Sequence, residues 1–191
     1  MKRTVLALAL IIASFTAAAQ NSEIIFNSQE PTTGLKCMGT SDIIVRSGFT
    51  DRHPLKIGIL AVETSKGWAY SLEVAVFELV SSAIPEGGVL LIRTKNDEVI
   101  ELTNKLSEAQ STDFVGQWIE GTASKTYYNK GSYSVTREQL EMIAGGVQKI
   151  RVQVGGGVFD TEYKKDRMGA AVAAHLAALD ATEAKDIRAD F

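Results

Sequence analysis

The stretch YSVTREQLEMIAGGVQKIRVQV, residues 133–154, constrains the fold of this chain more than any other segment. Thr136 and Gln139 have the T-x-x-Q spacing of a capping box, which satisfies the free backbone N–H groups at the start of a helix. Gly145 and Gly146 then end that helix. The stretch therefore predicts a strand, a short capped helix, a tight stop and a second strand.

The second strand of this stretch alternates apolar and polar side chains, the period of a strand with one buried face. We expect its apolar side chains to enter the core and its polar ones to face solvent: Ile150, Val152 and Val154 inward, and Lys149, Arg151 and Gln153 outward. The motifs of this stretch are structural, so they predict the fold and indicate no catalytic or binding residue.

The N-terminal segment MKRTVLALALIIASFTAAAQ has two cations, an apolar run from Val5 to Ile12, and small residues before Gln20. These features are typical of a secretory signal peptide over residues 1–19, because the apolar run is far shorter than the roughly 20 residues that span a bilayer. No cysteine lies near the cleavage point, so lipid attachment is not expected. The sequence predicts a soluble periplasmic or secreted protein, without membrane insertion after cleavage, with one domain over 20–191.

The charge of the chain argues against nucleic acid as a partner. Loss of residues 1–19 removes two cations and no acid, so the formal net charge moves from −3 to −5. Binding to nucleic acid or to an anionic membrane usually needs a clustered cationic face. The densest basic group, Lys164-Lys165 with Arg167, alternates with acids and is interpreted as a solvated helix face.

Residues that carry catalytic chemistry are few. The chain has one cysteine and two histidines, His53 and His175, and it lacks H-E-x-x-H, G-x-S-x-G and any Cys/His cluster with metal-binding spacing. The sequence therefore predicts no catalytic residue, no metal site and no cofactor. We interpret Cys37 as a small buried apolar residue and His175 as a partly buried or rim histidine. The acids near residue 100 are interpreted as turn and surface residues: Asp97, Glu98 and Glu101.

Two hairpins are predicted in the middle of the chain. The first joins residues 56–63 to 68–79 through a turn at 64–67. In its second strand one face is large and apolar and is expected to lie in the core: Trp68, Tyr70, Leu72, Val74 and Val76. The other face is mixed and small, and is either covered by a helix or partly wet: Ala69, Ser71, Glu73, Ala75 and Phe77.

The second hairpin joins VLLIRTK to EVIEL, and the parity of its side chains selects its loop. A two-residue loop would place Ile92 opposite Glu101 and mix the two faces. A three-residue loop over 95–97 instead pairs Ile92 with Ile100, and Leu90 with Leu102. We therefore predict a three-residue loop, in which Asn96 or Asp97 adopts the left-handed conformation.

The C-terminal part predicts a long helix. Gly155-Gly156-Gly157 fits neither phosphate-binding glycine motif and is interpreted as a hinge or bulge. We expect Asp160 or Thr161 to cap a helix from Glu162 to about Ala184. Its apolar side chains form a single stripe that can cover the sheet: Met168, Val172, Leu176 and Leu179.

Four aromatic residues lie on a polar, glycine-containing segment that is hard to place: Phe114, Trp118, Tyr127 and Tyr128. Rigid aromatic side chains on loops are typical of binding surfaces, so these four are the predicted ligand- or partner-binding residues. The alternative is a lid folded over the sheet. An edge strand is also expected around 125–128.

The runs GGVLLIRTKNDEVIEL and YSVTREQLEMIAGGVQKIRVQV resemble a pattern found in small exported proteins of Gram-negative bacteria whose activity is unassigned. The resemblance covers roughly residues 55–180. It implies a fold and a compartment, and it supplies no site residues.

These observations predict an α+β fold: an antiparallel β-meander with a short capped helix and a C-terminal helix packed on one face. A small, partly open β-barrel with the same helix is the alternative. Three functions stay open. They are a non-catalytic binding module for a protein or glycan partner in the cell envelope, a small exported hydrolase using carboxylates, and a structural or accessory envelope protein.

Overall fold

The computed structural model describes residues 22–29, 32–46, 55–78, 83–106, 115–119, 122–155 and 157–189. The predicted signal peptide and His53 lie outside these residues. Two helices are present in the described part, α2 (Arg137–Ala144) and α3 (Met168–Ala189). The strands are β1 (Ile24–Gln29), β2 (Lys36–Thr40), β3 (Ile43–Arg46), β4 (Leu55–Thr64), β5 (Gly67–Glu78), β6 (Val89–Thr94), β7 (Val99–Thr103), β8 (Val115–Ile119), β9 (Thr122–Val135), β10 (Val147–Val154) and β11 (Gly157–Glu162).

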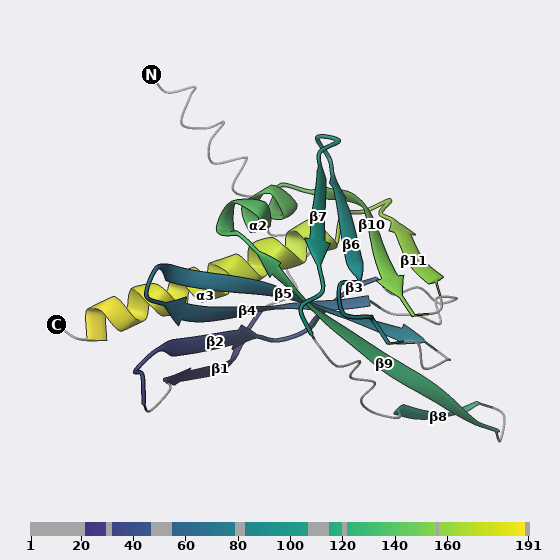
Figure 1. The fold of residues 1–191 in the computed structure, drawn as a ribbon, viewed down its shortest axis with the longest axis horizontal. Coiled ribbons are helices and arrows are strands. Elements are labelled where there is room, and N and C mark those ends of the chain that lie inside the picture. Colours follow the sequence, from purple (N-terminus) through teal and green to yellow (C-terminus); the bar gives the residue numbers. More distant parts are fainter. Residues whose placement is uncertain are drawn as a thin grey trace, which may run out of the picture.

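The strands form two antiparallel sheets (Figure 1). The long sheet has the order β1-β2-β4-β5-β9-β8, and β3 pairs with β4 beside β2. The short sheet has the order β11-β10-β6-β7, and its strands run across the direction of β4 and β5 in Figure 1. This confirms the predicted α+β class. Within the described residues the sheets do not close, so the barrel alternative is wrong.

Asn104 joins the two sheets. It follows β7, is 1% exposed, and forms an isolated bridge with Tyr133 of β9. Its side-chain Oδ1 accepts a hydrogen bond from the backbone N–H of Ser132 at 3.0 Å, and its Nδ2 donates to the Pro85 carbonyl at 2.9 Å. The backbone N–H of Lys105 donates to the Ser132 carbonyl at 2.8 Å. The position of Ser132 is therefore fixed from the short sheet.

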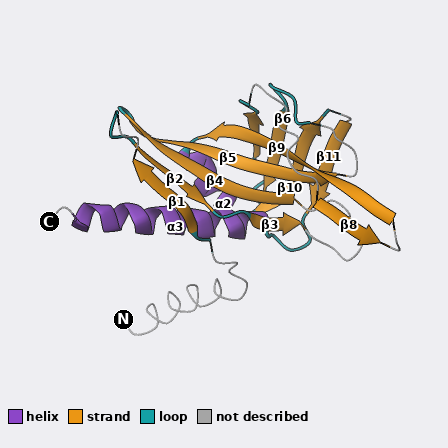
Figure 2. Cartoon of the chain, turned by 90° about the horizontal axis from the view of Figure 1, so that it is seen from below, coloured by secondary structure: helices purple, strands orange, loops and turns teal. Residues whose placement is uncertain are grey.

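A single apolar core lies between the sheets and the two helices. Helix α3 packs against α2 and along one face of β4, as Figure 2 shows. The predicted stripe of α3 is at most 6% exposed: Met168, Val172, Leu176 and Leu179. No helix in the described ranges combines the length and apolar character needed to cross a bilayer.

Residues 133–154 have the predicted structure of a strand, a short capped helix and a second strand. Thr136 accepts a hydrogen bond from the Gln139 backbone N–H at 3.2 Å, and the Gln139 side chain accepts one from the Thr136 N–H at 2.9 Å. Helix α2 ends at Ala144 with Gly145 as its C-cap, and Gly146 adopts a φ of 134°. In β10 the three predicted inward residues are at most 6% exposed: Ile150, Val152 and Val154.

Both predicted hairpins are also confirmed. Strands β4 and β5 pair from Thr64 opposite Gly67, and β6 and β7 pair Ile92 with Ile100. The second hairpin has the three-residue loop over 95–97, because the backbone N–H of Thr94 donates to the Glu98 carbonyl at 2.9 Å. Asp97 adopts the left-handed conformation, with a φ of 62°.

The start of the C-terminal helix was predicted wrongly. Strand β10 pairs with residues 157–162, which are strand β11 and not helix, and Phe159 and Thr161 of this strand point inward. Helix α3 begins at Met168. The predicted caps, Asp160 and Thr161, lie in β11. Instead, Oδ1 of Asp166 accepts a hydrogen bond from the backbone N–H of Gly169 in the first turn of α3, at 2.8 Å. The basic group at 164–167 is exposed but precedes the helix.

Candidate functional site

The four predicted binding residues were expected on a loop, but the three that the structure describes lie in strands. Phe114 lies outside the described residues. Trp118 is in β8 opposite Ala123, and Tyr127 and Tyr128 are in β9 opposite the last two residues of β5. Residues 125–128 are therefore in a strand as expected, but β9 lies between β5 and β8, so the edge strand is β8. The β8–β9 hairpin continues past the end of β5 (Figure 1), and its role as a binding surface stays a prediction.

His175 is fully buried, so its prediction as a rim residue is wrong. Its Nε2 lies 3.3 Å from the Ile57 carbonyl, which can only accept, so Nε2 carries the proton. Its Nδ1 then accepts from the Ser22 hydroxyl at 2.7 Å. Burial lowers the pKa of His175 to about 4, and the bond to Ile57 opposes this shift. The ring is neutral and joins α3 to β4 and to Ser22, two residues before β1.

Cys37 is half-buried and not buried as predicted. The next residue, Met38, enters the core and is 0% exposed. Since successive side chains of a strand point to opposite faces, Cys37 must lie on the outer face of the long sheet. Among the described residues, no group of three or more His, Cys, Asp or Glu side chains could hold a metal ion.

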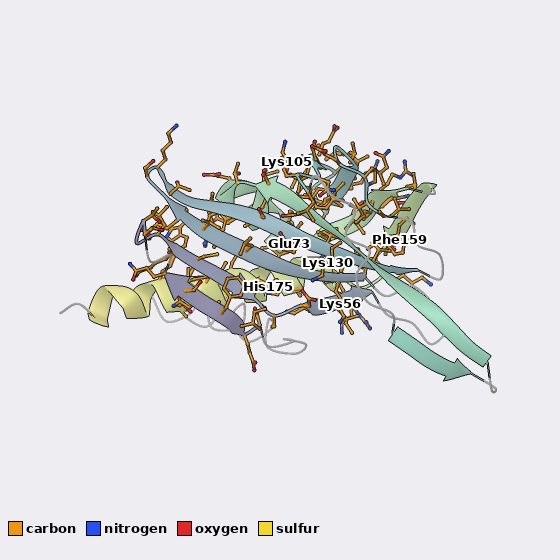
Figure 3. All side chains as sticks on the ribbon, turned by 60° about the horizontal axis from the view of Figure 1, so that its bottom comes forward. Lys56, Glu73, Lys105, Lys130, Phe159 and His175 are labelled. Carbon is orange, nitrogen blue, oxygen red and sulfur yellow. The ribbon has the colours of Figure 1, made fainter. Side chains whose placement is uncertain are left out.

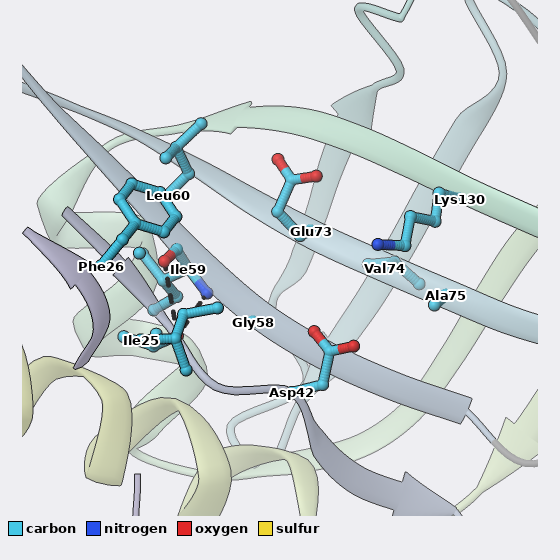
Figure 4. A pocket seen from close by; sticks show the side chains of 12 residues that line it. Ile25, Phe26, Asp42, Gly58, Ile59, Leu60, Glu73, Val74, Ala75 and Lys130 are labelled. Atoms are coloured by element: carbon cyan, nitrogen blue, oxygen red, sulfur yellow. Dashed lines mark hydrogen bonds between the residues drawn. The ribbon is translucent and has the colours of Figure 1, made fainter. Parts of the chain in front are cut away.

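A groove of about 260 Å³ lies on this outer face, on the side of the long sheet opposite α3 (Figure 4). Strands β1, β2, β4, β5 and β9 and the link between β2 and β3 contribute to it. The residues that line it are Ile25, Phe26, Gly39, Thr40, Asp42, Gly58, Ile59, Leu60, Glu73, Val74, Ala75 and Lys130. We call this site the groove.

Strand register places the charged groups of the groove next to one another. On the outer face, one row across β4, β5 and β9 is Gly58, Glu73 and Ser132. The adjacent row is Lys56, Ala75 and Lys130. Glu73 and Lys130 lie close together near the middle of the long sheet (Figure 3). Side chains on one face of neighbouring strands interact directly.

Two glycines make the groove possible. A Cβ on Gly39 would stand 2.1 Å from Cε1 of Phe26, so the aromatic ring lies on the bare backbone of Gly39. A Cβ on Gly58 would stand 3.2 Å from Oδ1 of Asp42. Both distances are too short for ordinary contacts, so larger residues would displace the wall of the groove or the Asp42 carboxylate.

Asp42 lies in the two-residue link between β2 and β3, and this link places its carboxyl beside Gly58. At the end of β2 the Thr40 hydroxyl accepts from the Ile59 backbone N–H at 2.8 Å and donates to the Ile59 carbonyl at 3.3 Å. The hydroxyl therefore takes the place of a backbone partner where regular pairing stops. The chain can then turn toward β3 while Asp42 stays over β4.

Glu73 has the most perturbed carboxyl of the groove. Burial raises the pKa of Glu73, and the hydroxyl of Ser132 and the charge of Lys130 oppose that shift, while Asp42 adds to it. The Ser132 hydroxyl donates to Oε1 of Glu73. Because Asn104 fixes Ser132, the short sheet indirectly positions this carboxyl. Glu73 is thus a half-buried acid that keeps its proton to a higher pH than usual.

The short sheet offers a contrast. A hollow of about 460 Å³ lies on its outer face, where Arg151 is the charged lining residue. That guanidinium is held by Asp160 at 2.8 Å, and Lys149 reaches both Asp160 and Glu162 at 3.2 Å. These pairs are solvent-exposed, and such pairs contribute little. The groove, with its half-buried Glu73 carboxyl of raised pKa, is the better candidate site although its volume is smaller.

Comparisons of the chain with protein family models, with curated proteins and with solved structures found no match. The groove was not among the sequence predictions. The sequence did indicate one residue of the groove, because Glu73 lies in the middle of a strand whose outer face is small and mixed. Asp42 and Phe26 could not be assigned to the same site, because the pairing of β1, β2 and β3 was not predictable from their short, turn-rich sequence.

Proposed function

We propose that this protein is an exported binding module, periplasmic or secreted, whose groove binds a small ligand. One observation carries the proposal: Asp42, Glu73 and Lys130, from three separate segments, line one hollow of about 260 Å³. Binding sites are typically concave and mostly apolar, with a few convergent polar groups and a perturbed carboxyl. The groove has each of these features.

The carboxyl of Glu73 supports a role in binding more than one in stability. Its raised pKa means that its ionised form is less stable in the folded than in the unfolded protein. Proteins keep such destabilising groups mainly at functional sites. The apolar walls around it would exclude water from a bound ligand and strengthen polar contacts.

A fragment screen by amide chemical shifts tests this function. Fragments that bind the groove should shift the backbone amides of Gly39, Gly58 and Ser132 in the exported protein. Gly58→Val should abolish these shifts, because the new side chain fills the floor and displaces Asp42. Ala69→Val is the matched control, since Ala69 is exposed on the same face outside the groove. Fragments that bind Gly58→Val equally well would refute the proposal.

A carboxylate-dependent hydrolase is the second candidate function. It is favoured by the presence of two carboxyls in one groove, of which Glu73 has the raised pKa that a general acid needs. Asp42 would then act as the base or nucleophile. Release of nitrophenol from 4-nitrophenyl glycosides should be lost in Glu73→Gln. Equal release by wild type and Glu73→Gln would exclude this activity.

A further inference from the structure

We infer that the groove binds one pyranose ring of an uncharged sugar, which stacks on Phe26 and turns its hydroxyls toward Asp42 and Lys130. The inference rests on the proposed function and names the chemical class of its ligand. Three features of the groove carry it: an aromatic ring on a fixed support, a balanced set of charges beside that ring, and a volume that suits one sugar ring.

Phe26 presents its ring on a rigid support. It lies directly opposite Gly39 in the pairing of β1 with β2, and the ring lies over the bare backbone of that glycine. Phe26 is still 41% exposed, so the side of the ring away from Gly39 is open to solvent. The face of an aromatic ring is slightly negative, and the C–H groups on one face of a pyranose are slightly positive. A sugar ring can therefore stack on Phe26.

An irregularity in β1 adds a second residue to this wall. The register of β1 with β2 shifts between Ile24 and Phe26. Ile25 and Phe26 both line the groove, although consecutive side chains of a regular strand point to opposite faces. Bulges of this kind are frequent beside functional sites, where they redirect a side chain. Ile25 is 62% exposed, so a ligand on Phe26 would also cover this apolar side chain.

The polar side of the groove lies one row further along the sheet. The row of Phe26 continues on the outer face through Gly39 to Leu60. Gly58 is two residues before Leu60, which is about 7 Å along β4. Oδ1 of Asp42 lies 3.2 Å from the point where a Gly58 Cβ would stand. A ring stacked on Phe26 would therefore direct one edge toward this carboxyl.

The charges of the groove suit hydroxyl groups better than an ion. Figure 4 shows the Glu73 carboxyl turned toward β9 and the Lys130 ammonium directed into the space between Glu73 and Asp42. Lys56 and Lys130 balance the two acids on this face. A bound cation or anion would therefore meet a group of its own sign.

A hydroxyl can use both kinds of charged group. It donates to a carboxylate such as Asp42 and accepts from an ammonium such as Lys130. A carboxylate has about four acceptor positions and an ammonium has three donors, so partners within the protein leave positions for a ligand. Two neighbouring hydroxyls of one sugar can thus bond to both groups without adding charge to the groove.

The volume limits the bound part to one sugar ring. The groove has about 260 Å³, which is less than the roughly 300–1,000 Å³ typical of sites for drug-sized ligands. It lies on a sheet face that neither described helix covers, so further residues of a glycan chain could extend into solvent.

The test titrates the exported protein with the methyl glycosides of glucose, galactose, mannose and N-acetylglucosamine. Amide shifts at Gly39 and Gly58 report binding in the groove. We expect at least one of them to bind with a Kd of about 1 mM, and about tenfold more tightly than cyclohexylmethanol, a similar ring without the ring hydroxyls. The methyl glycosides of glucuronate and glucosamine, which carry one charge each, should bind more weakly than the best neutral sugar.

Two variants separate the aromatic from the polar contact. Phe26→Leu keeps an apolar side chain without an aromatic face and should weaken sugar binding about tenfold, whereas Phe26→Tyr should retain it. Val99→Ala, at an exposed apolar residue of the short sheet, is the control. Asp42→Ala should also weaken binding about tenfold, and Glu101→Ala, at another exposed acid, should not.

Equal binding of cyclohexylmethanol and the best glycoside would overturn the sugar class, as would tighter binding of either charged sugar. Unchanged sugar binding by Phe26→Leu and Asp42→Ala would do the same. If no glycoside shifts the groove amides, the sugar class is also overturned, and the fragment screen with Gly58→Val decides the proposed function separately. For a sugar that binds, tighter binding of its trisaccharide indicates a glycan chain as the source, and equal binding indicates a free sugar.

Discussion

The two faces of β5 carry side chains of different size and polarity. On the inner face the side chains are large, apolar and at most 1% exposed: Leu72, Val74 and Val76. On the outer face they are small or polar and line or adjoin the groove: Ser71, Glu73 and Ala75. One strand thus supplies core packing on one side and part of the lining of the groove on the other. The comparison teaches that a candidate site can form on a stable sheet where neither described helix covers the second face.

The two faces also hold titrating groups whose effects have opposite signs. His175 reaches the backbone of β4 from the inner side, and burial lowers its pKa. Glu73 lies on the outer side, and burial raises its pKa. In both cases burial disfavours the charged form. Acid should therefore destabilise the protein through His175 and stabilise it through Glu73.

The largest expected effect comes from a charge on the inner face. Leu72→Asp should unfold the protein, because Leu72 is 0% exposed and a buried unpaired carboxylate costs more than the total stability of about 5–15 kcal/mol can tolerate. Ser71→Asp, the next residue on the outer face, should stay folded. Amide spectra of both variants measure this, and a folded Leu72→Asp would contradict the assignment of the faces.

The second effect is the acid sensitivity from His175. The unfolded chain binds a proton below about pH 6.5, but the folded protein does so only below about pH 4. Stability should therefore fall as pH drops through this window, by about 3 kcal/mol at most. Urea unfolding at several pH values should show a shallower fall for His175→Gln. The same slope in both proteins would show that His175 does not resist protonation.

A smaller effect is expected where α3 is attached to the core. Asp166 accepts from the backbone N–H groups of Gly169 and Val147 and pairs with Lys95 at 3.3 Å. Asp166→Ala should cost about 1–3 kcal/mol of unfolding free energy, because it leaves two N–H groups without partners. Asp160→Ala, which breaks exposed pairs, should cost less than about 1 kcal/mol. Equal losses would contradict this role.

The smallest effect should be a gain. Glu73→Gln removes a carboxylate whose ionised form is disfavoured in the fold, and the amide can still accept from Ser132. The melting temperature at neutral pH should rise, by about 2–4 °C for each kcal/mol relieved. The gain should vanish at low pH, where Glu73 of the wild type is protonated. A lower melting temperature for Glu73→Gln would place this residue among the stabilising groups.

The parts of the fold that depend on neighbouring residues were predictable from the sequence. The capping box of Thr136 and Gln139 acts across one helical turn, and the loop before Glu98 follows from side-chain parity. Strand β11 was missed because Phe159 and Thr161 give only a short alternation, and three glycines before it suggested a hinge. A helix was therefore started at Glu162, six residues too early.

The site could not be predicted because it depends on contacts between distant segments. Phe26, Asp42 and Glu73 meet only after β1, β2, β3 and β4 have paired. Each residue alone has an ordinary explanation as a surface or strand residue. Gly39 and Gly58 carried no sequence signal, since the need for glycine arises from the side chains that lie over them.

Melting curves of wild type and Gly58→Val, each with and without a fragment that shifts the amides of the groove, test the central claim most directly. The claim is that the groove on the outer face of the long sheet is a binding site. It predicts that the fragment raises the melting temperature of the wild type and leaves that of Gly58→Val unchanged. Equal rises in both proteins would contradict it.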